Sequence, residues 1–144
     1  MTVDFNKYSD LLDKNYEKTL GKVVKVVGLT IESVGPNANL NDLCYIVSND
    51  RTQTVMAEVV GFREDRILLM PYGNVEGIGI GSTVESTMAP LKVPVGDELL
   101  GETLDGLGNP IDGSELDLHD FYSVLAPPPD PMKRKLIDQV LPLG

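Results

Sequence analysis

Cysteine, histidine and tryptophan are almost absent from this chain, which has one cysteine, one histidine and no tryptophan. A single thiol excludes an intramolecular disulfide and fits a reducing cytosolic compartment. Cys44 lies in the apolar run 43–47, which favours a buried structural thiol over a nucleophile. His119 has no second histidine with which to build a His/Cys metal cluster. The sequence therefore indicates no catalytic, cofactor-binding or metal-ligating residue.

Aromatic residues and positive charge are also scarce. Aromatic residues make up 6% of the 144 residues, and the formal net charge is -10. Such a chain repels a phosphate backbone and offers few rings for base stacking, so nucleic acid is not an expected partner. No stretch approaches the roughly 18 apolar residues of a membrane span, and the polar N-terminus is not typical of a secretory signal. We therefore expect no direct membrane span.

The negative charge is concentrated between residues 91 and 120. This segment has one basic residue, Lys92, and eight acids: Asp97, Glu98, Glu102, Asp105, Asp112, Glu115, Asp117 and Asp120. One interpretation is a solvated acidic surface. The other is that a basic surface of a neighbouring domain or subunit lies against it.

Residues 1–20 predict an amphipathic helix. Asp4 is a suitable cap and Gly21 follows where the helix would end. At 100° per residue, one arc of about 140° collects the apolar side chains. These are Phe5, Tyr8, Leu11, Leu12 and Tyr16. The face either packs on the β-barrel that we predict below for the same chain, or it docks a partner protein.

Residues 21–90 change to a β pattern, with Val and Ile runs separated by Gly, Pro, Asn and Asp. Val24 and Val26 alternate with Lys22 and Lys25 in the first run. The predicted strands are Lys22–Val27, Leu29–Val34, Leu43–Ser48, Thr54–Phe62, Arg66–Met70 and Thr83–Met88. No helix-length pattern separates them, so the sheet is antiparallel, and closure would remove its exposed edges. We predict a mainly β fold: a six-stranded antiparallel closed β-barrel.

The glycine-rich run 77–81 does not predict a phosphate-binding loop. The β-prone residues 83–87 follow it, so no helix N-terminus is available to hold a phosphate. We interpret the glycines as a tight bend before the last strand.

Residues 91–144 carry turn-rich and proline-rich sequence. Asp97 is positioned to cap one helical turn that ends before Gly101. Residues 126–131 form a polyproline-like spacer. The last third of the chain, beyond Gly113, has few apolar residues per element, and we do not expect it to form a domain on its own. We expect residues 91–144 to be poorly anchored without a sheet to join.

Two motifs in this part identify a family. Val95–Gly113 is similar to the V-G-x-x-L-L-G-R-V-x-D-x-x-G-x-P-x-D-G pattern of the rotary ATP synthase and type III secretion ATPase superfamily, with Glu102 where that pattern usually has Arg. Residues 126–144 resemble the approach to the nucleotide-binding domain of the flagellum-specific export ATPase. Upstream, Gly21–Val24 and Leu69–Tyr72 match the family's barrel.

The resemblance implies three regions: an N-terminal helix (1–20), a β-barrel (21–90) and the start of a nucleotide-binding domain (91–144), an incomplete α/β extension. The phosphate-cradling G-x-x-x-x-G-K-[ST] loop is missing from the sequence. The resemblance thus implies that the chain stops before this loop and is inactive alone, whereas the full-length parent would hydrolyse ATP with Mg²⁺.

By the same resemblance, the parent works as a cytoplasmic homohexamer, peripheral to the inner-membrane export gate, that energises type III protein export. The barrels would stack into a ring. Phe5, Tyr8, Leu11, Leu12 and Tyr16 would dock the stalk-like regulator of the ATPase. Flagellar and virulence secretion remain open, with a preference for flagellar. The alternatives are an alpha or beta subunit of a proton-translocating ATP synthase and, more remotely, an oligonucleotide-binding barrel as in hexameric termination helicases.

Overall fold

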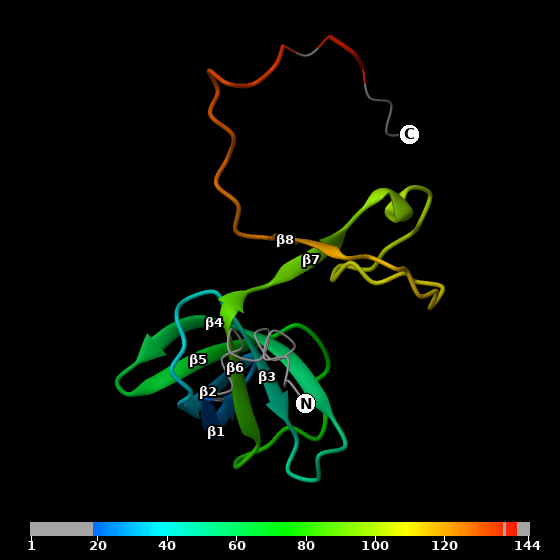
Figure 1. Cartoon of the computed structure of the whole chain (residues 1–144). Helices are drawn as coiled ribbons and strands as arrows, with labels where there is room; N and C mark the ends of the chain where they lie inside the picture. The colour runs from blue at the N-terminus through cyan, green and yellow to red at the C-terminus, as the bar shows by residue number, and fades with distance from the viewer. Residues whose placement is uncertain (1–18, 137, 141–144) are drawn as a thin grey trace, which may run out of the picture. The chain divides into compact units, whose positions relative to one another are not determined.

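The computed structural model describes residues 19–136 and 138–140. The chain divides after Leu91 into two compact units (Figure 1). The first contains a closed barrel, and the second contains a two-stranded sheet. The predicted helix over residues 1–20, with its face of Phe5, Tyr8, Leu11, Leu12 and Tyr16, lies outside the described residues except for its last two positions.

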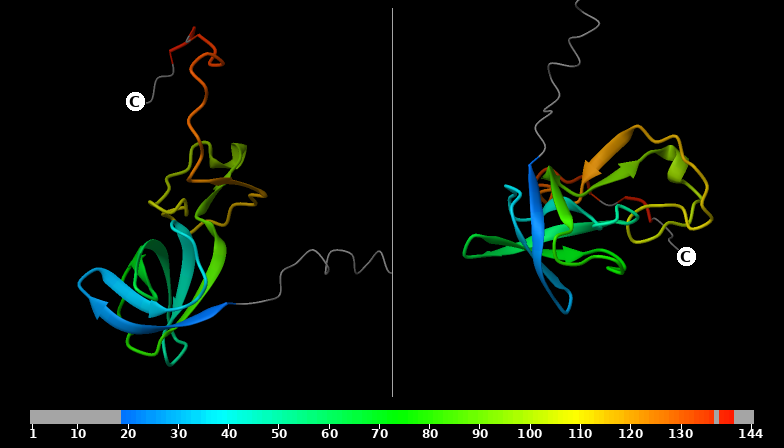
Figure 2. Two further views of the ribbon diagram at one scale, coloured as in Figure 1. Left: turned by 90° about the vertical axis from the view of Figure 1, so that its left-hand side faces the viewer. Right: turned by 90° about the horizontal axis from the view of Figure 1, so that it is seen from below.

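Six antiparallel strands form the barrel. In their order around it they are β1 (Leu20–Val27), β2 (Thr30–Val34), β5 (Arg66–Pro71), β4 (Thr54–Arg63), β3 (Asp42–Val47) and β6 (Thr83–Pro90). β6 pairs with β3 on one side and with β1 on the other, which closes the sheet. The strands curve around one interior in the two views of Figure 2. The predicted six-stranded antiparallel barrel is confirmed.

Every strand contributes to one apolar core. Its buried members are Val23, Ile31, Cys44, Ile46, Ala57, Val59, Ile67, Leu69 and Val84. Branched aliphatic side chains suit the inner face of a small barrel because they pack well on a pleated surface. Cys44 is fully buried, and desolvation raises the pKa of its thiol to about 11. The prediction of a buried structural thiol is confirmed.

The start of β1 lies against the loop that follows β2. A Cβ built on Gly21 would collide with the carbonyl group of Gly35, so only glycine fits there. The hydroxyl of the buried Ser33 contacts the carbonyl oxygens of Lys22 and Gly35 at 3.0 and 2.6 Å. This contact joins the first hairpin to the loop, and it is possible because glycine at position 21 has no side chain.

The glycine-rich run before β6 is a bend, as predicted. Gly77 and Gly81 have φ of 80° and 90°, in the left-handed region that favours glycine. The amide of Gly81 donates to the carbonyl oxygen of Val23 at 2.8 Å. The chain then enters β6 directly.

The second unit pairs β7 (Lys92–Val95) with β8 (Asp120–Ser123), and its described residues include the 3₁₀ turn η2 (Asp97–Leu99). The predicted helical turn is therefore present. Its predicted cap is wrong, because Gly96 occupies the N-cap position and no side chain bonds to the turn.

The described residues of this unit contain no α-helix. The mainly β part of the predicted fold class is thus confirmed, whereas the helical part of the expected α/β extension is not found among those residues. Two aromatic side chains of β8, Phe121 and Tyr122, are exposed. The expectation that this segment is poorly anchored remains a prediction.

The close contact at Gly21 gives a stability test. We expect Gly21→Ala to lower the free energy of unfolding by about 2–3 kcal/mol, because backbone atoms on both sides would have to move. Gly73→Ala is the matched control: its Cβ would meet nothing within 4 Å, and a change within about 0.5 kcal/mol is expected. Urea unfolding of both variants measures the difference. Equal stabilities would contradict the contact.

Candidate functional site

The predicted docking face at Phe5, Tyr8, Leu11, Leu12 and Tyr16 lies outside the described residues. Candidate sites among the described residues come from the outer surface of the barrel. Two such surfaces stand out, and both arise from the pairing register of the strands.

The first surface depends on a bulge in β1. Val23 pairs with Ser33, and Lys25 then pairs with Glu32, so Val24 is an extra residue in the ladder. An extra residue reverses the side of every later side chain on the strand. Val23 therefore faces the core, whereas Lys25 shares the outer face with Glu32. The exposure predicted for Lys22 and Lys25 is found, whereas the core position predicted for Val24 is occupied by Val23.

A second bulge lies in β4. Val59 pairs with Leu69 inside the barrel, Gly61 then pairs with Leu68, and Val60 is the extra residue. The reversal brings Arg63 to the outer face, opposite Arg66. β2 pairs with β5 without a bulge, between the two bulged strands. Lys25, turned outward by the first bulge, and Arg63, turned outward by the second, therefore flank the same β2–β5 pair.

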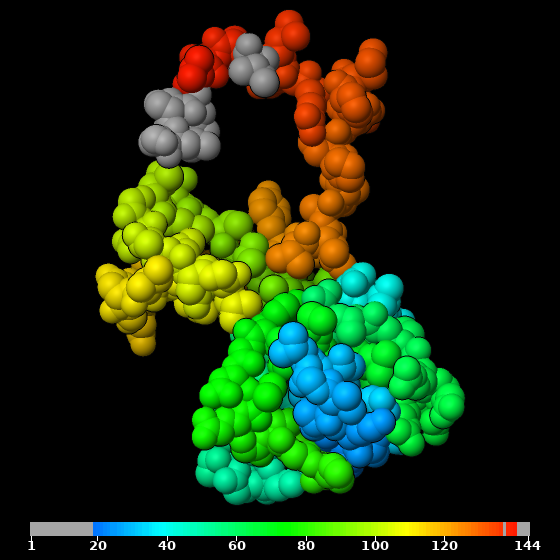
Figure 3. Space-filling model, turned by 180° about the vertical axis from the view of Figure 1, so that it is seen from behind, coloured from blue at the N-terminus to red at the C-terminus, as the bar shows by residue number. Residues whose placement is uncertain are grey.

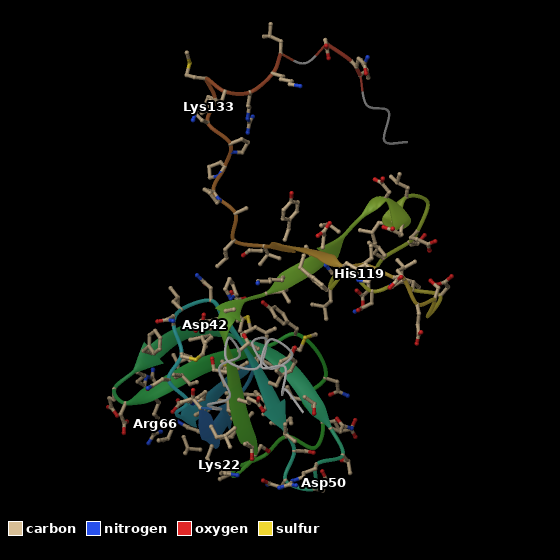
Figure 4. All side chains as sticks on the ribbon, viewed as in Figure 1. Lys22, Asp42, Asp50, Arg66, His119 and Lys133 are labelled. Atoms are coloured by element: carbon tan, nitrogen blue, oxygen red, sulfur yellow. The ribbon has the colours of Figure 1, made fainter. Side chains whose placement is uncertain are left out.

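Glu32 is the centre of this surface, and we call Lys25, Glu32, Arg63 and Arg66 the Glu32 cluster. The side chain of Glu32 is only 7% exposed. Arg66 donates to its Oε2 at 2.9 Å, and Nη1 of Arg63 lies 3.6 Å from its Oε1 (Arg66 is labelled in Figure 4). An almost buried carboxylate is retained at low cost only when it is paired in this way.

A pocket of about 260 Å³ adjoins the cluster. It is lined by Lys25, Val27, Thr30, Glu32, Arg63 and Leu68. Side chains of β1 and β2, in blue, lie beside those of later strands, in green, on the outer surface in Figure 3. Its lining has two cations, Lys25 and Arg63, and one carboxylate, which Arg66 also pairs from outside the lining, so the pocket favours an anionic group.

The second surface is a strip of tyrosine and methionine side chains around one glutamate, and it crosses β3, β4 and the end of β5. We call it the Tyr45 face; its members are Tyr45, Met56, Glu58, Met70 and Tyr72. Tyr45 pairs with Met56, and Glu58 pairs with Met70. The Tyr72 hydroxyl donates to Glu58 at 2.7 Å, and desolvation together with this bond raises the pKa of Tyr72 to about 12. Tyr45, Met70 and Tyr72 are 37%, 45% and 36% exposed.

The described residues do not fit a nucleotide with its Mg²⁺. The glycine-rich run 77–81 enters a strand, so it offers no helix N-terminus to a phosphate. No group of three or more acidic, His or Cys side chains among the described residues is arranged to hold a metal ion. No described helix is long and apolar enough to cross a membrane.

Comparison with known proteins gives these surfaces a context. Residues 23–88 match the model of the ATP synthase alpha/beta family, beta-barrel domain. The described barrel, from Leu20 in β1 to Pro90 in β6, contains the whole matched region. The chain belongs to the ATP synthase alpha/beta family. Its barrel is the N-terminal domain of the flagellum-specific and type III secretion branch, as the motifs indicated.

Three similar proteins place it in that branch. The chain is 43% identical to the flagellum-specific ATP synthase of Bacillus subtilis over 88% of its own length and 30% of the relative. It is 42% identical to the type 3 secretion system ATPase of Xanthomonas euvesicatoria, over 86% of the chain and 28% of the relative. The assembled ATPase EscN of the enteropathogenic E. coli type III secretion system aligns with a TM-score of 0.68 and 32% identity, over 83% and 28% of the two chains. The chain therefore spans under a third of the length of these relatives.

Sequence reasoning missed the Glu32 cluster of this barrel domain. Lys25 and Arg63 are far apart in the sequence, and without bulges strict alternation would turn both toward the core. One signal could have predicted the cluster: a lysine or arginine at a position where strict alternation predicts a core residue. Such a residue indicates a bulge that shifts the register and turns its side chain outward.

The ion pair at Glu32 gives a double-mutant test. We expect Arg66→Ala to lower the free energy of unfolding by about 1–3 kcal/mol, because the nearly buried carboxylate loses its nearer partner. In a Glu32→Gln background, the same change should cost less than about 1 kcal/mol, since no buried charge is left unpaired. Chemical unfolding of the four proteins measures this coupling, and additive effects would contradict the pairing.

Proposed function

We propose that this chain is the N-terminal oligomerisation and regulator-docking region of an ATPase that energises type III protein export. The observation that carries the proposal is the Tyr45 face on a closed barrel. A closed barrel has no free strand edge, so two barrels cannot associate by extending their sheets. Barrels that associate therefore make contact through side chains on their outer faces, and Tyr and Met are enriched at such contacts.

The likeness to an assembled ATPase of type III secretion supports a ring. In a ring each subunit presents one surface to the next subunit and a different surface to the previous one. The Tyr45 face supplies one of these surfaces. We propose a homohexamer in the cytoplasm, peripheral to the inner-membrane export gate, whose hydrolysis of ATP with Mg²⁺ takes place outside the described residues. Both the flagellar and the virulence relatives support the export branch over an energy-conserving synthase.

The amphipathic segment at the N-terminus supplies the docking function. In the helix predicted from the sequence, its apolar side chains share one arc, and a terminal helix buries such an arc against a neighbour. The proposed partner is the stalk-like regulator of the export ATPase, bound through Phe5, Tyr8, Leu11, Leu12 and Tyr16.

Calorimetry tests the docking role. We expect Tyr8→Asp and Leu12→Asp each to weaken binding of the regulator at least tenfold, because a charge replaces an apolar contact. Asn6→Asp adds the same charge off the predicted arc and should leave the affinity unchanged. Unchanged affinity in both apolar variants would remove this part of the proposal.

Sedimentation velocity tests the ring-forming role of the Tyr45 face. We expect Tyr45→Asp and Met70→Asp each to shift self-association of the chain to at least tenfold higher concentration, since both introduce an unpaired charge into the contact. Ile80→Asp is the control, because Ile80 is 73% exposed and lies outside the Tyr45 face. The role is excluded if the control and the two face variants associate alike.

A further inference from the structure

We propose that the pocket beside the Glu32 cluster binds the acidic segment, residues 97–120, of a second copy of the chain. This inference rests on the proposed ring and identifies one of its contacts. It makes the contact head-to-tail: the barrel of one copy holds the acidic segment of the next.

The first support is unbalanced charge. Among the described residues of the barrel unit there are five basic side chains: Lys22, Lys25, Arg51, Arg63 and Arg66. Two of them, Lys25 and Arg63, line the pocket beside one carboxylate, so the lining has a net charge of about +1. The exposed acids nearest in the sequence, Glu64 and Asp65, belong to the β4–β5 turn and are not part of that lining. Arg66 holds Glu32 at 2.9 Å, whereas Arg63 lies farther away and is 66% exposed. The guanidinium of Arg63 is thus accessible to a further anion.

The second support is the surface around the pocket. Val27 and Leu68 line it, and Val27 is 55% exposed. Exposed Leu29 follows in the two-residue turn between β1 and β2. A pocket lined by both cations and aliphatic side chains suits a carboxylate that follows an apolar residue in a peptide.

The acidic segment matches this description. All eight of its acids are exposed. Exposed Ile111 directly precedes Asp112, and Leu104 directly precedes Asp105, so the segment offers the apolar–acidic pairs that the pocket suits. Asp105 is held in a defined turn, because its Oδ1 accepts from the amides of Leu107 and Asn109, each at 2.8 Å.

A second copy is the occupant because the two surfaces are complementary and different. A contact between unlike surfaces propagates from subunit to subunit and closes into a ring when the rotation allows it. The charges also predict that the association weakens as salt rises. Salt ions screen the attraction between exposed charges, and the screening (Debye) length is about 8–10 Å near physiological ionic strength.

Zero-length cross-linking tests the contact. Carbodiimide joins an amine to a carboxylate only when the two touch, and Lys25 is the amine that lines the pocket. Unlabelled chain is mixed with chain labelled with heavy nitrogen, so mass spectrometry separates links within one copy from links between copies. We expect mixed-isotope links between Lys25 and acids within residues 97–120, with a yield that falls at least fivefold in high salt.

Three variants sharpen the test. Lys25→Arg removes the amine but keeps the charge, so the link should disappear while self-association persists. Arg63→Gln should lower the yield of the Lys25 link at least threefold and shift self-association to higher concentration. Arg51→Gln removes an exposed cation of the barrel outside the pocket, and it should change neither readout.

The outcomes separate this inference from the proposed ring. Lys25 links only within one copy, or only to acids outside residues 97–120, would overturn the inference while self-association seen by sedimentation upheld the ring. An equal effect of Arg51→Gln and Arg63→Gln would also overturn it, because general charge would then explain the association. A chain that is monomeric at every concentration would overturn both.

Discussion

The outer surface of this barrel depends on a one-residue difference between the pairing register set by its turns and the register required by its core. In the β1–β2 hairpin, the turn pairs Val27 with Thr30, and a regular ladder from there would place Val24 opposite Ser33. The core instead pairs Val23 with Ser33, both buried. The bulge at Val24 absorbs the difference. In the β4–β5 hairpin, a bulge at Val60 absorbs the same one-residue difference in register.

The electrostatics of the barrel follow from these two bulges. Each reverses the side of the residues nearest the turn, which brings Lys25 and Arg63 outward to Glu32. A buried lysine or arginine would destabilise the core strongly, whereas on the outer face Arg63 lies 3.6 Å from the nearly buried carboxylate of Glu32. The resulting pocket is cationic in a chain with a net charge of -10, and this contrast supports a contact with the acidic segment.

The sequence predicted the barrel well and its outer surface poorly. Val and Ile runs between turn residues are strong local signals, so all six strands and the burial of Cys44 were predicted. The motif Val95–Gly113 identified the family because its glycines and prolines are tied to specific turns. Bulges have no such local signal: they arise when a turn and a core compete for register, which needs both strands. The cap at Asp97 failed because Gly96 supplies the N-cap position instead.

Backbone NMR of the chain tests the register directly. The bulged register predicts cross-strand nuclear Overhauser contacts of Val26 with Ile31, and of Arg63 with Arg66 across the second turn. A register without bulges would pair Lys25 with Ile31 and Phe62 with Arg66, which would turn Lys25 and Arg63 toward the core. Observation of this second set would contradict the Glu32 cluster and the contact built on it.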